Sequence, residues 1–289
     1  MANSVVWQEE WELHLQDRLD KPTNWKEVCE VVLTDTKVLH RPYETLPSVQ
    51  TGTRGSAYTF QDITSTDDNV NISTYENLAV LLDRADLAQQ SFYNRMVLAD
   101  YQARLIDERL ESLMLADHAS WTNFGTSDIG EGGSATDPIT VTAANIDDII
   151  RGVLQKIETA NGIEMLRRYG AFIIWRSADY NKLRQVMQAN GFNAADEALR
   201  TGGEIGVEYM GVKHYLSTSH TALHVMAGVR KGLTLGLCKS TWGKIVQIDE
   251  PAGASGGNVS GIGVVSRVDY KFKLFNNMST LVYDVNVAA

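Results

Sequence analysis

One long helical pattern constrains this chain more than any other feature of its sequence. From about Asp83 to His118, small or apolar residues recur in steps of three or four, which keeps them on one side of a helix. These residues are Ala85, Ala88, Phe92, Met96, Ala99, Ala103, Ile106, Leu110 and Leu113. A helix of this length would extend about 50 Å, about three times the average helix of a globular protein. We therefore expect a flat, extended subunit rather than a compact enzyme.

The first 39 residues have the pattern of an arm. Trp7 and Trp11 begin an i, i+4 series beside acidic residues, which predicts a short amphipathic helix that ends before Pro22. Trp25 begins a second short segment. Because Trp is enriched where a segment anchors on a neighbouring surface, these three residues are candidate assembly contacts. Packing of the arm on its own domain is an equally open interpretation.

The segment that follows predicts a β-hairpin without a core of its own. Two alternating runs, at residues 58–61 and 70–73, flank a polar turn at residues 67–69. Each strand carries about two large apolar side chains, and an isolated two-stranded hairpin is only marginally stable in water. The hairpin must therefore lie on its own domain or be held by a neighbouring subunit. Its candidate assembly contacts are Arg54, Tyr58, Phe60, Asp67 and Asp68.

The pattern changes to compact α/β after a glycine-rich link at residues 125–138. Helices are predicted over residues 142–161 and 177–190, the second capped by Ser177. The continuous apolar run 171–175 predicts a buried strand between them. The rest of the chain is β-rich. Strands are predicted there at residues 207–217, 222–227, 244–248, 264–275 and 279–287.

The composition argues against several functional classes. The formal net charge of −10 and a pI near 5.1 disfavour a protein that wraps nucleic acid in a basic groove. No stretch reaches about 18 uninterrupted apolar residues, and the N-terminus lacks a basic-then-apolar signal, so neither a membrane-spanning helix nor secretion is expected. Cys29 and Cys238 are interpreted as free thiols made in a reducing compartment, with a disulfide between them left open.

No set of residues has a convincing spacing for catalysis. His214, His220 and His224 are close in sequence, and the last two have the i, i+4 spacing of helical metal ligands. The segment has a strand and loop pattern, so we favour structural histidines over a metal site, with a metal-dependent hydrolase as an alternative. The glycine-rich residues 253–263 lack the Lys-Ser/Thr of a P-loop, and no Gly-x-Ser-x-Gly elbow is present. We expect no catalytic residues, no metal and no cofactor.

The order of these parts resembles the major capsid proteins of tailed bacteriophages, which have the Hong Kong 97-type fold. That order is arm, extended hairpin, long helix, glycine-rich link, compact α/β module and β-rich tail. Residues 82–90 are similar to the start of the family's spine helix. The stretches that resemble its axial domain are residues 143–157, 170–175, 180–183, 209–213, 217–219 and 224–228.

The resemblance implies an α+β chain with the phage major capsid fold, divided into four parts. They are an N-terminal arm at residues 1–39, an extended loop formed by a β-hairpin at 40–75, a peripheral β-rich domain at 76–139 and 238–289 that includes the spine helix 83–118, and a compact α/β axial domain at 140–237. Some relatives join subunits by an isopeptide bond from a lysine on the extended loop. No lysine occurs between Lys37 and Lys156, so no such bond is expected here.

The function that the resemblance implies is structural. Subunits would self-assemble into hexamers and pentamers of the icosahedral head shell that encloses double-stranded phage DNA, without sequence-specific binding and without a membrane. The implied location is the virion capsid, with synthesis in the host cytoplasm, and the implied partners are portal, scaffolding and decoration proteins. Two other interpretations stay open. An encapsulin-type shell would hold an enzyme cargo, and an extended adhesin or tail component would need no icosahedral neighbours.

Overall fold

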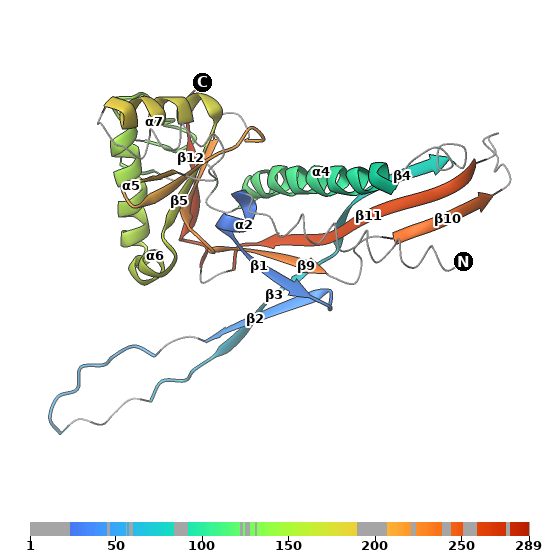
Figure 1. Cartoon of the computed structure of the whole chain (residues 1–289). Coiled ribbons are helices and arrows are strands. Elements are labelled where there is room, and N and C mark those ends of the chain that lie inside the picture. The colour runs from blue at the N-terminus through green and yellow to red at the C-terminus, as the bar shows by residue number, and fades with distance from the viewer. Residues whose placement is uncertain are drawn as a thin grey trace.

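The computed structural model describes most of the chain. The described residues are 24–44, 47–55, 57, 60–83, 92–121, 124, 128–130, 132–189, 207–220, 224–238, 244–250, 259–275 and 278–288. They form an α/β module, a long sheet with helix α4 beside it, and a two-stranded ribbon that projects away from both (Figure 1).

The α/β module is built around a five-stranded sheet with strand order β12-β8-β5-β7-β6. Its elements are α5 (Ile146–Thr159), α6 (Ile163–Tyr169), β5 (Ala171–Trp175), α7 (Ser177–Ala189), β6 (Val207–Tyr209), β7 (Val212–Leu216), β8 (His224–Val229) and β12 (Val282–Asn286). The central strand β5 runs parallel to β7 and antiparallel to β8. The predicted strand 207–217 is instead two strands, because Met210 and Gly211 both have positive φ and form a tight turn between β6 and β7.

The long sheet also has five strands, in the order β1-β9-β11-β10, with β4 paired to β11. Its strands are β1 (Cys29–Thr34), β4 (Thr74–Asp83), β9 (Leu233–Cys238), β10 (Lys244–Glu250) and β11 (Val259–Lys273). The central strand is β11. It pairs with β4 along one edge, and with β10 and then β9 along the other. The short helix α2 (Asn24–Val28) leads directly into β1.

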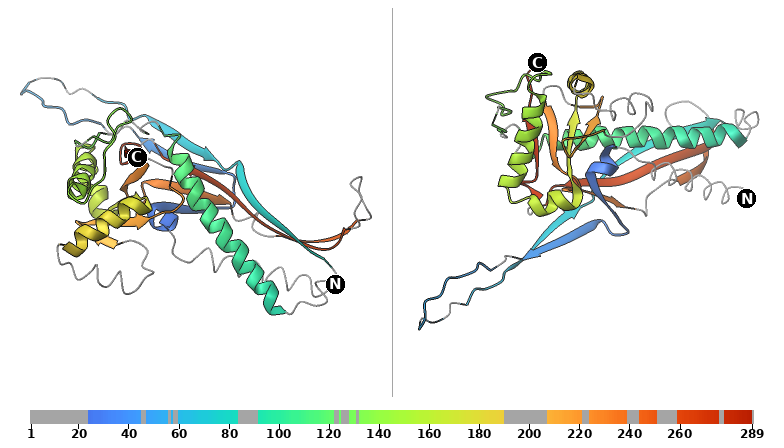
Figure 2. Two further views of the ribbon diagram at one scale, coloured as in Figure 1. Left: turned by 90° about the horizontal axis from the view of Figure 1, so that it is seen from above. Right: turned by 60° about the vertical axis from the view of Figure 1, so that its left-hand side comes forward.

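Helix α4 (Phe92–His118) lies along the long sheet, beside β11 and β4 (Figure 1 and Figure 2). Its 27 residues correspond to about 40 Å of helix. Ala103, Ile106 and Leu110 of the predicted stripe are buried, and Leu113 is partly buried against the same core. In the C-terminal half of α4, the predicted apolar stripe therefore coincides with the face of the helix that packs against the core.

The start of this helix was predicted at about Asp83; Asp83 itself lies in strand β4, and the described part of the helix begins at Phe92. Strand β4 continues to Asp83, where the ladder with β11 ends at Gly261. Residues 84–91, which include Ala85 and Ala88, lie outside the described residues.

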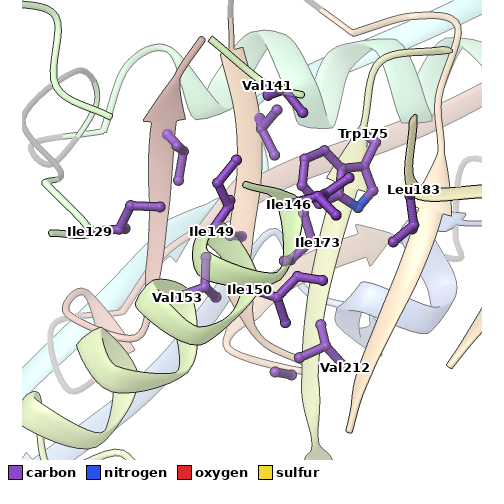
Figure 3. Close-up of a cluster of buried hydrophobic side chains, with 14 of the residues drawn as sticks. Ile129, Val141, Ile146, Ile149, Ile150, Val153, Ile173, Trp175, Leu183 and Val212 are labelled. Carbon is purple, nitrogen blue, oxygen red and sulfur yellow. The ribbon is translucent and has the colours of Figure 1, made fainter. Parts of the chain in front are cut away.

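Strand β5 is buried on both faces, which explains its continuous apolar sequence. Ala171, Ile173 and Trp175 belong to the core that the module forms with α5 and α7 (Figure 3). The alternate residues Phe172 and Ile174 belong to a second core, which the module shares with α2, α4 and the long sheet. The two cores therefore lie on opposite faces of this sheet, and β8, with Val225 and Ala227 in the first core and Met226 in the second, divides its residues in the same way.

The ribbon consists of β2 (Val38–Glu44) and β3 (Ser65–Asn71), which pair antiparallel. The predicted turn at residues 67–69 is wrong, because these residues lie inside β3. Polar partners explain how acidic residues are accommodated in a strand: His40 Nδ1 lies 2.8 Å from Asp67 Oδ2, and Lys273 Nζ lies 2.9 Å from Asp68 Oδ1. Residues 60–64 of the predicted hairpin form no strand, and 58–59 lie outside the described residues.

Three segments belong to parts of the molecule other than those expected. Strand β12 pairs with β8 in the α/β module, although the resemblance implied that it belongs to the peripheral domain. Strand β9 pairs with β1 and β11 in the long sheet, although residues 233–237 fall in the predicted axial domain. Helix α2 and β1 pack into the body although they fall in the predicted arm, whose residues 1–23 lie outside the described residues. All three depend on pairing between residues that are distant in sequence.

Candidate assembly surfaces

The base of the ribbon is fixed to the long sheet. Arg41 Nη1 donates to Glu30 Oε2 at 2.9 Å and to Thr234 Oγ1 at 3.2 Å, which connects β2 to β1 and β9. Ile72, just after β3, is buried against Gly236, where an added Cβ would lie 3.1 Å from Ile72 Cδ1. These contacts give the ribbon a defined direction relative to the body.

The loop at the far end of the ribbon exposes large apolar side chains. Val49 and Phe60 are 101% and 94% exposed, and Ile63 is 59% exposed. The two sides of the loop are joined by an amide pairing, in which Ser48 N–H donates to Gln61 Oε1 at 2.8 Å and Gln61 Nε2 donates to Ser48 O at 3.0 Å. The loop thus has local order, while its apolar side chains face water.

The predicted assembly contacts fall into four groups. Arg54 and Phe60 are exposed on the loop. Asp67 and Asp68 lie in the ribbon and contact His40 and Lys273 of the same chain; hydrogen bonds, chiefly from His40, lower the pKa of the Asp67 carboxyl. Trp25 is 1% exposed and lies in the second core, so its side chain contacts its own subunit. The remaining contacts, Trp7, Trp11 and Tyr58, lie outside the described residues.

Two apolar surfaces were not found by sequence reasoning. The first is formed by Val49 and Ile63, which lie in a loop rich in small polar residues. Their apolar side chains in such a segment could have indicated an exposed contact surface. Val31 and Leu33 are exposed on β1, the end strand of the sheet order. An edge strand of this kind can accept another chain. The sequence of β1 does not distinguish it from a buried strand, because a strand is an edge only through its position in the sheet.

The three histidines singled out in the sequence have structural roles. Trp175 Nε1 donates to His214 Nδ1 at 2.9 Å, and burial lowers the pKa of His214 to about 4. His224 Nδ1 lies 3.0 Å from Asp284 Oδ2, and His220 Nε2 accepts from the Met226 N–H at 3.3 Å. Among the described residues no group of His, Cys, Asp and Glu side chains could hold a metal ion. Within the same part of the chain, no helix is long and apolar enough to cross a membrane.

Solved structures share this arrangement over most of the chain. The mature capsid of bacteriophage PhiM1 superposes with a TM-score of 0.61 at 10% identity, covering 93% of this chain and 88% of that one. The capsid of Cyanophage P-SCSP1u gives 0.59 at 12% identity, covering 93% and 89%. This chain has the fold of tailed-phage major capsid proteins. No protein-family model matches the sequence of this capsid-fold chain, and no curated protein matches it.

The same fold is also found in a virus-like particle. The virus-like particle from Pyrococcus furiosus superposes with a TM-score of 0.57 at 11% identity, covering 97% of this chain and 99% of that one. At such low identities the likeness is one of fold, and it contains no residue-level information. The surfaces of this capsid-fold chain must therefore be interpreted from its own side chains.

Proposed function

We propose that this chain is the major capsid protein of a tailed phage, and that its copies assemble into hexamers and pentamers of an icosahedral shell around double-stranded DNA. The observation that carries the proposal is the ribbon, fixed at its base by Arg41 and exposing Val49 and Phe60 at its far end. A separate subunit leaves these side chains in water. Burial against a second copy would contribute roughly 1.5–3 kcal/mol for each.

Each element has a place in this proposal. The ribbon and residues 45–64 are the extended loop, which lies across a neighbouring copy while the body receives the loop of another. The peripheral domain is the long sheet with α4 as its spine helix, and the axial domain is the α/β module, including β12. Head-to-tail contacts of this kind close into rings under rotational symmetry. Several contacts per subunit add avidity without any one of them being strong.

The partners follow from the same role. A shell of this kind contains a portal at one vertex, forms with a scaffolding protein and accepts decoration proteins on its outer face. Its DNA is enclosed rather than read, which agrees with the net charge of −10. The location of the assembled protein is the virion, after synthesis in the host cytoplasm.

Electron microscopy and sedimentation of the expressed full chain test the proposal. We expect closed shells, alone or with a scaffolding protein, and we expect Phe60→Ser to assemble poorly while it keeps the melting temperature of the parent subunit. Ile163→Ser is the matched control, because Ile163 is an exposed apolar residue of α6, away from the ribbon. Monomers or rods under all conditions, or equal assembly of both variants, would contradict the role of the loop.

A second candidate is an encapsulin-type shell with an enzyme cargo. It is favoured by the likeness to the virus-like particle from Pyrococcus furiosus, which this chain covers almost completely. Purified shells separate the two proposals. Nuclease-resistant genomic DNA inside the particle supports the phage head, whereas a second protein in fixed proportion and no DNA supports the cargo shell.

A further inference from the structure

A basic pocket lies where α2, the end of α6 and the turn between β8 and β9 meet. It is an open cavity of about 380 Å³, lined by Lys26, Glu27, Arg168, Tyr169, Arg230 and Lys231. Four cationic side chains therefore face one carboxylate, in a chain whose net charge is −10. In Figure 1, α2 stands at the junction of the α/β module with the long sheet, and α6 is at the lower end of the module.

A backbone carbonyl and a carboxylate hold the Arg230 guanidinium at the wall of the pocket. Arg230 Nε donates to Tyr169 O at 2.6 Å, and Nη1 lies 3.7 Å from Glu27 Oε2. Gly170 has a φ of 75° and lies against the guanidinium, where an added Cβ would be 3.3 Å from Arg230 Nη2. The arginine is thus placed before any ligand arrives.

Lys231 occupies a position that favours glycine. Its φ is 61°, in the left-handed region that glycine adopts without steric cost. Its N–H donates to Val28 O at 2.6 Å, which ties the turn to α2. Glycine at this position could donate the same backbone hydrogen bond without the steric cost. The lysine therefore adds only its side chain to the turn, and it does so in a strained backbone conformation. Strained positions of this kind are concentrated at functional sites.

Two of the four cations have no ion-pair partner among the described residues. Within the described part of the chain, neither Arg168 nor Lys231 forms an ion pair; both lie near the ring of Tyr169, at 5.2 and 5.7 Å from its centre. Glu27 is shared by Arg230 and Lys213. The surplus positive charge is therefore concentrated on one side of the pocket, beside an aromatic ring.

We propose that this pocket binds a phosphate group. Arg168, Arg230 and Lys231 supply the donors that phosphate oxygens accept, and arginine matches their geometry well. The group would come from the backbone of a single-stranded nucleic acid, for which cations beside an aromatic ring are the usual arrangement, or from free phosphate. The proposal does not rest on the shell role, since binding is a property of the purified chain in any state of assembly.

Binding to the full-length protein tests the proposal. The probes are inorganic phosphate, measured by calorimetry, and a short labelled oligothymidylate, measured by fluorescence anisotropy at several salt concentrations. The variant Arg168→Gln/Lys231→Gln should lose roughly tenfold in affinity for each cation removed. Its plot of log affinity against log salt for the oligonucleotide should become shallower by about one unit per cation. The control Arg104→Gln/Arg167→Gln removes the same charge outside the pocket and should bind as the parent does.

A second variant separates binding from folding. Lys231→Gly removes the amine and relieves the left-handed strain, so it should bind phosphate more weakly while its melting temperature stays the same or rises. Oligonucleotide binding that phosphate displaces identifies the nucleic-acid source, and phosphate binding without oligonucleotide binding identifies the free anion. The proposal is overturned if neither probe saturates, if the pocket and control variants lose affinity equally, or if the pocket variant changes only the association between copies of the chain.

Discussion

The imidazole of His118 and the carboxylate of Asp284 face each other where α4 meets β12, with Nε2 3.5 Å from Oδ1. Both side chains are buried. The other carboxylate oxygen lies 3.0 Å from His224 Nδ1, and the rings of Trp121 and Phe124 pack edge-on against His118. The end of α4 is therefore fixed to the α/β module through a polar cluster in which His118 and Asp284 are buried and His224 is partly exposed.

Burial of these histidines makes stability depend on pH. Burial first, and then the nearby His220 and His224, lowers the pKa of His118 to about 3, and burial lowers that of His214 to about 4. Both titrate near 6.5 in the unfolded chain, so below this pH the unfolded state binds protons that the folded state does not. The free energy of unfolding should be highest above pH 6.5 and should fall as the pH is lowered towards 4. Urea denaturation across this range measures it.

The share of His118 in this pH dependence can be isolated. In His118→Gln, the free energy of unfolding should fall less steeply as the pH is lowered, because the unfolded chain then has one fewer group that binds a proton only after unfolding. His40→Gln is the matched control, since His40 is exposed on the ribbon. An identical pH profile for His118→Gln and the parent would contradict the argument.

Ala103 tests the packing of α4. It is fully buried on the face of the helix towards the core. Ala103→Glu would place a carboxylate there and should cost about 3 kcal/mol or more in the free energy of unfolding. Tyr101→Glu, on the exposed side, should cost far less. Thermal melts followed by circular dichroism compare them, and a normal melting temperature for Ala103→Glu would contradict the burial of this face.

Local periodicity was enough to predict the elements whose packing is local. The range of β5 was predicted from its unbroken apolar run, and α5 and α7 were predicted from apolar residues at helical spacing. The polar strand β3 could not be predicted. Its Asp67 and Asp68 have the composition of a turn, and they belong to a strand because His40 and Lys273 approach them from other elements.

The sequence predicted an exposed hairpin loop, but it did not predict which residues pair in its strands. A hairpin without a core could be inferred from the low apolar content of residues 45–76, and Phe60 is exposed as that inference requires. Its first strand, β2, comes from residues before this segment, so the register could not be found locally. The basic pocket could not be found either, because Lys26, Arg168 and Lys231 are far apart in sequence and meet only through the fold.

The ion pair between Asp68 and Lys273 should stabilise the base of the ribbon measurably. Asp68 is nearly buried and Lys273 is partly exposed, so the pair is less screened than a surface pair. A double-mutant cycle with Asp68→Asn and Lys273→Met should give a coupling energy of about 1 kcal/mol in urea unfolding. The exposed pair Arg104 and Glu108 on α4 is the control, with a coupling of a few tenths expected. Equal couplings would mean that the ribbon base is not held by this contact.

The two cysteines should behave as unpaired, protected thiols. Both are free and buried, and the register of β1 with β9 places Cys29 opposite Leu233 and Cys238 opposite Thr34, five residues along the strand. Five residues of strand span about 16 Å, far beyond the reach of a disulfide, which answers the question that the sequence left open. Burial raises the pKa of the Cys29 thiol, which keeps it protonated and unreactive. Thiol titration of the native protein should therefore be slow, unfolding in denaturant should release two reactive groups, and reducing agents should leave the melting temperature unchanged. A melting temperature that falls on reduction would show that a bridge forms after all.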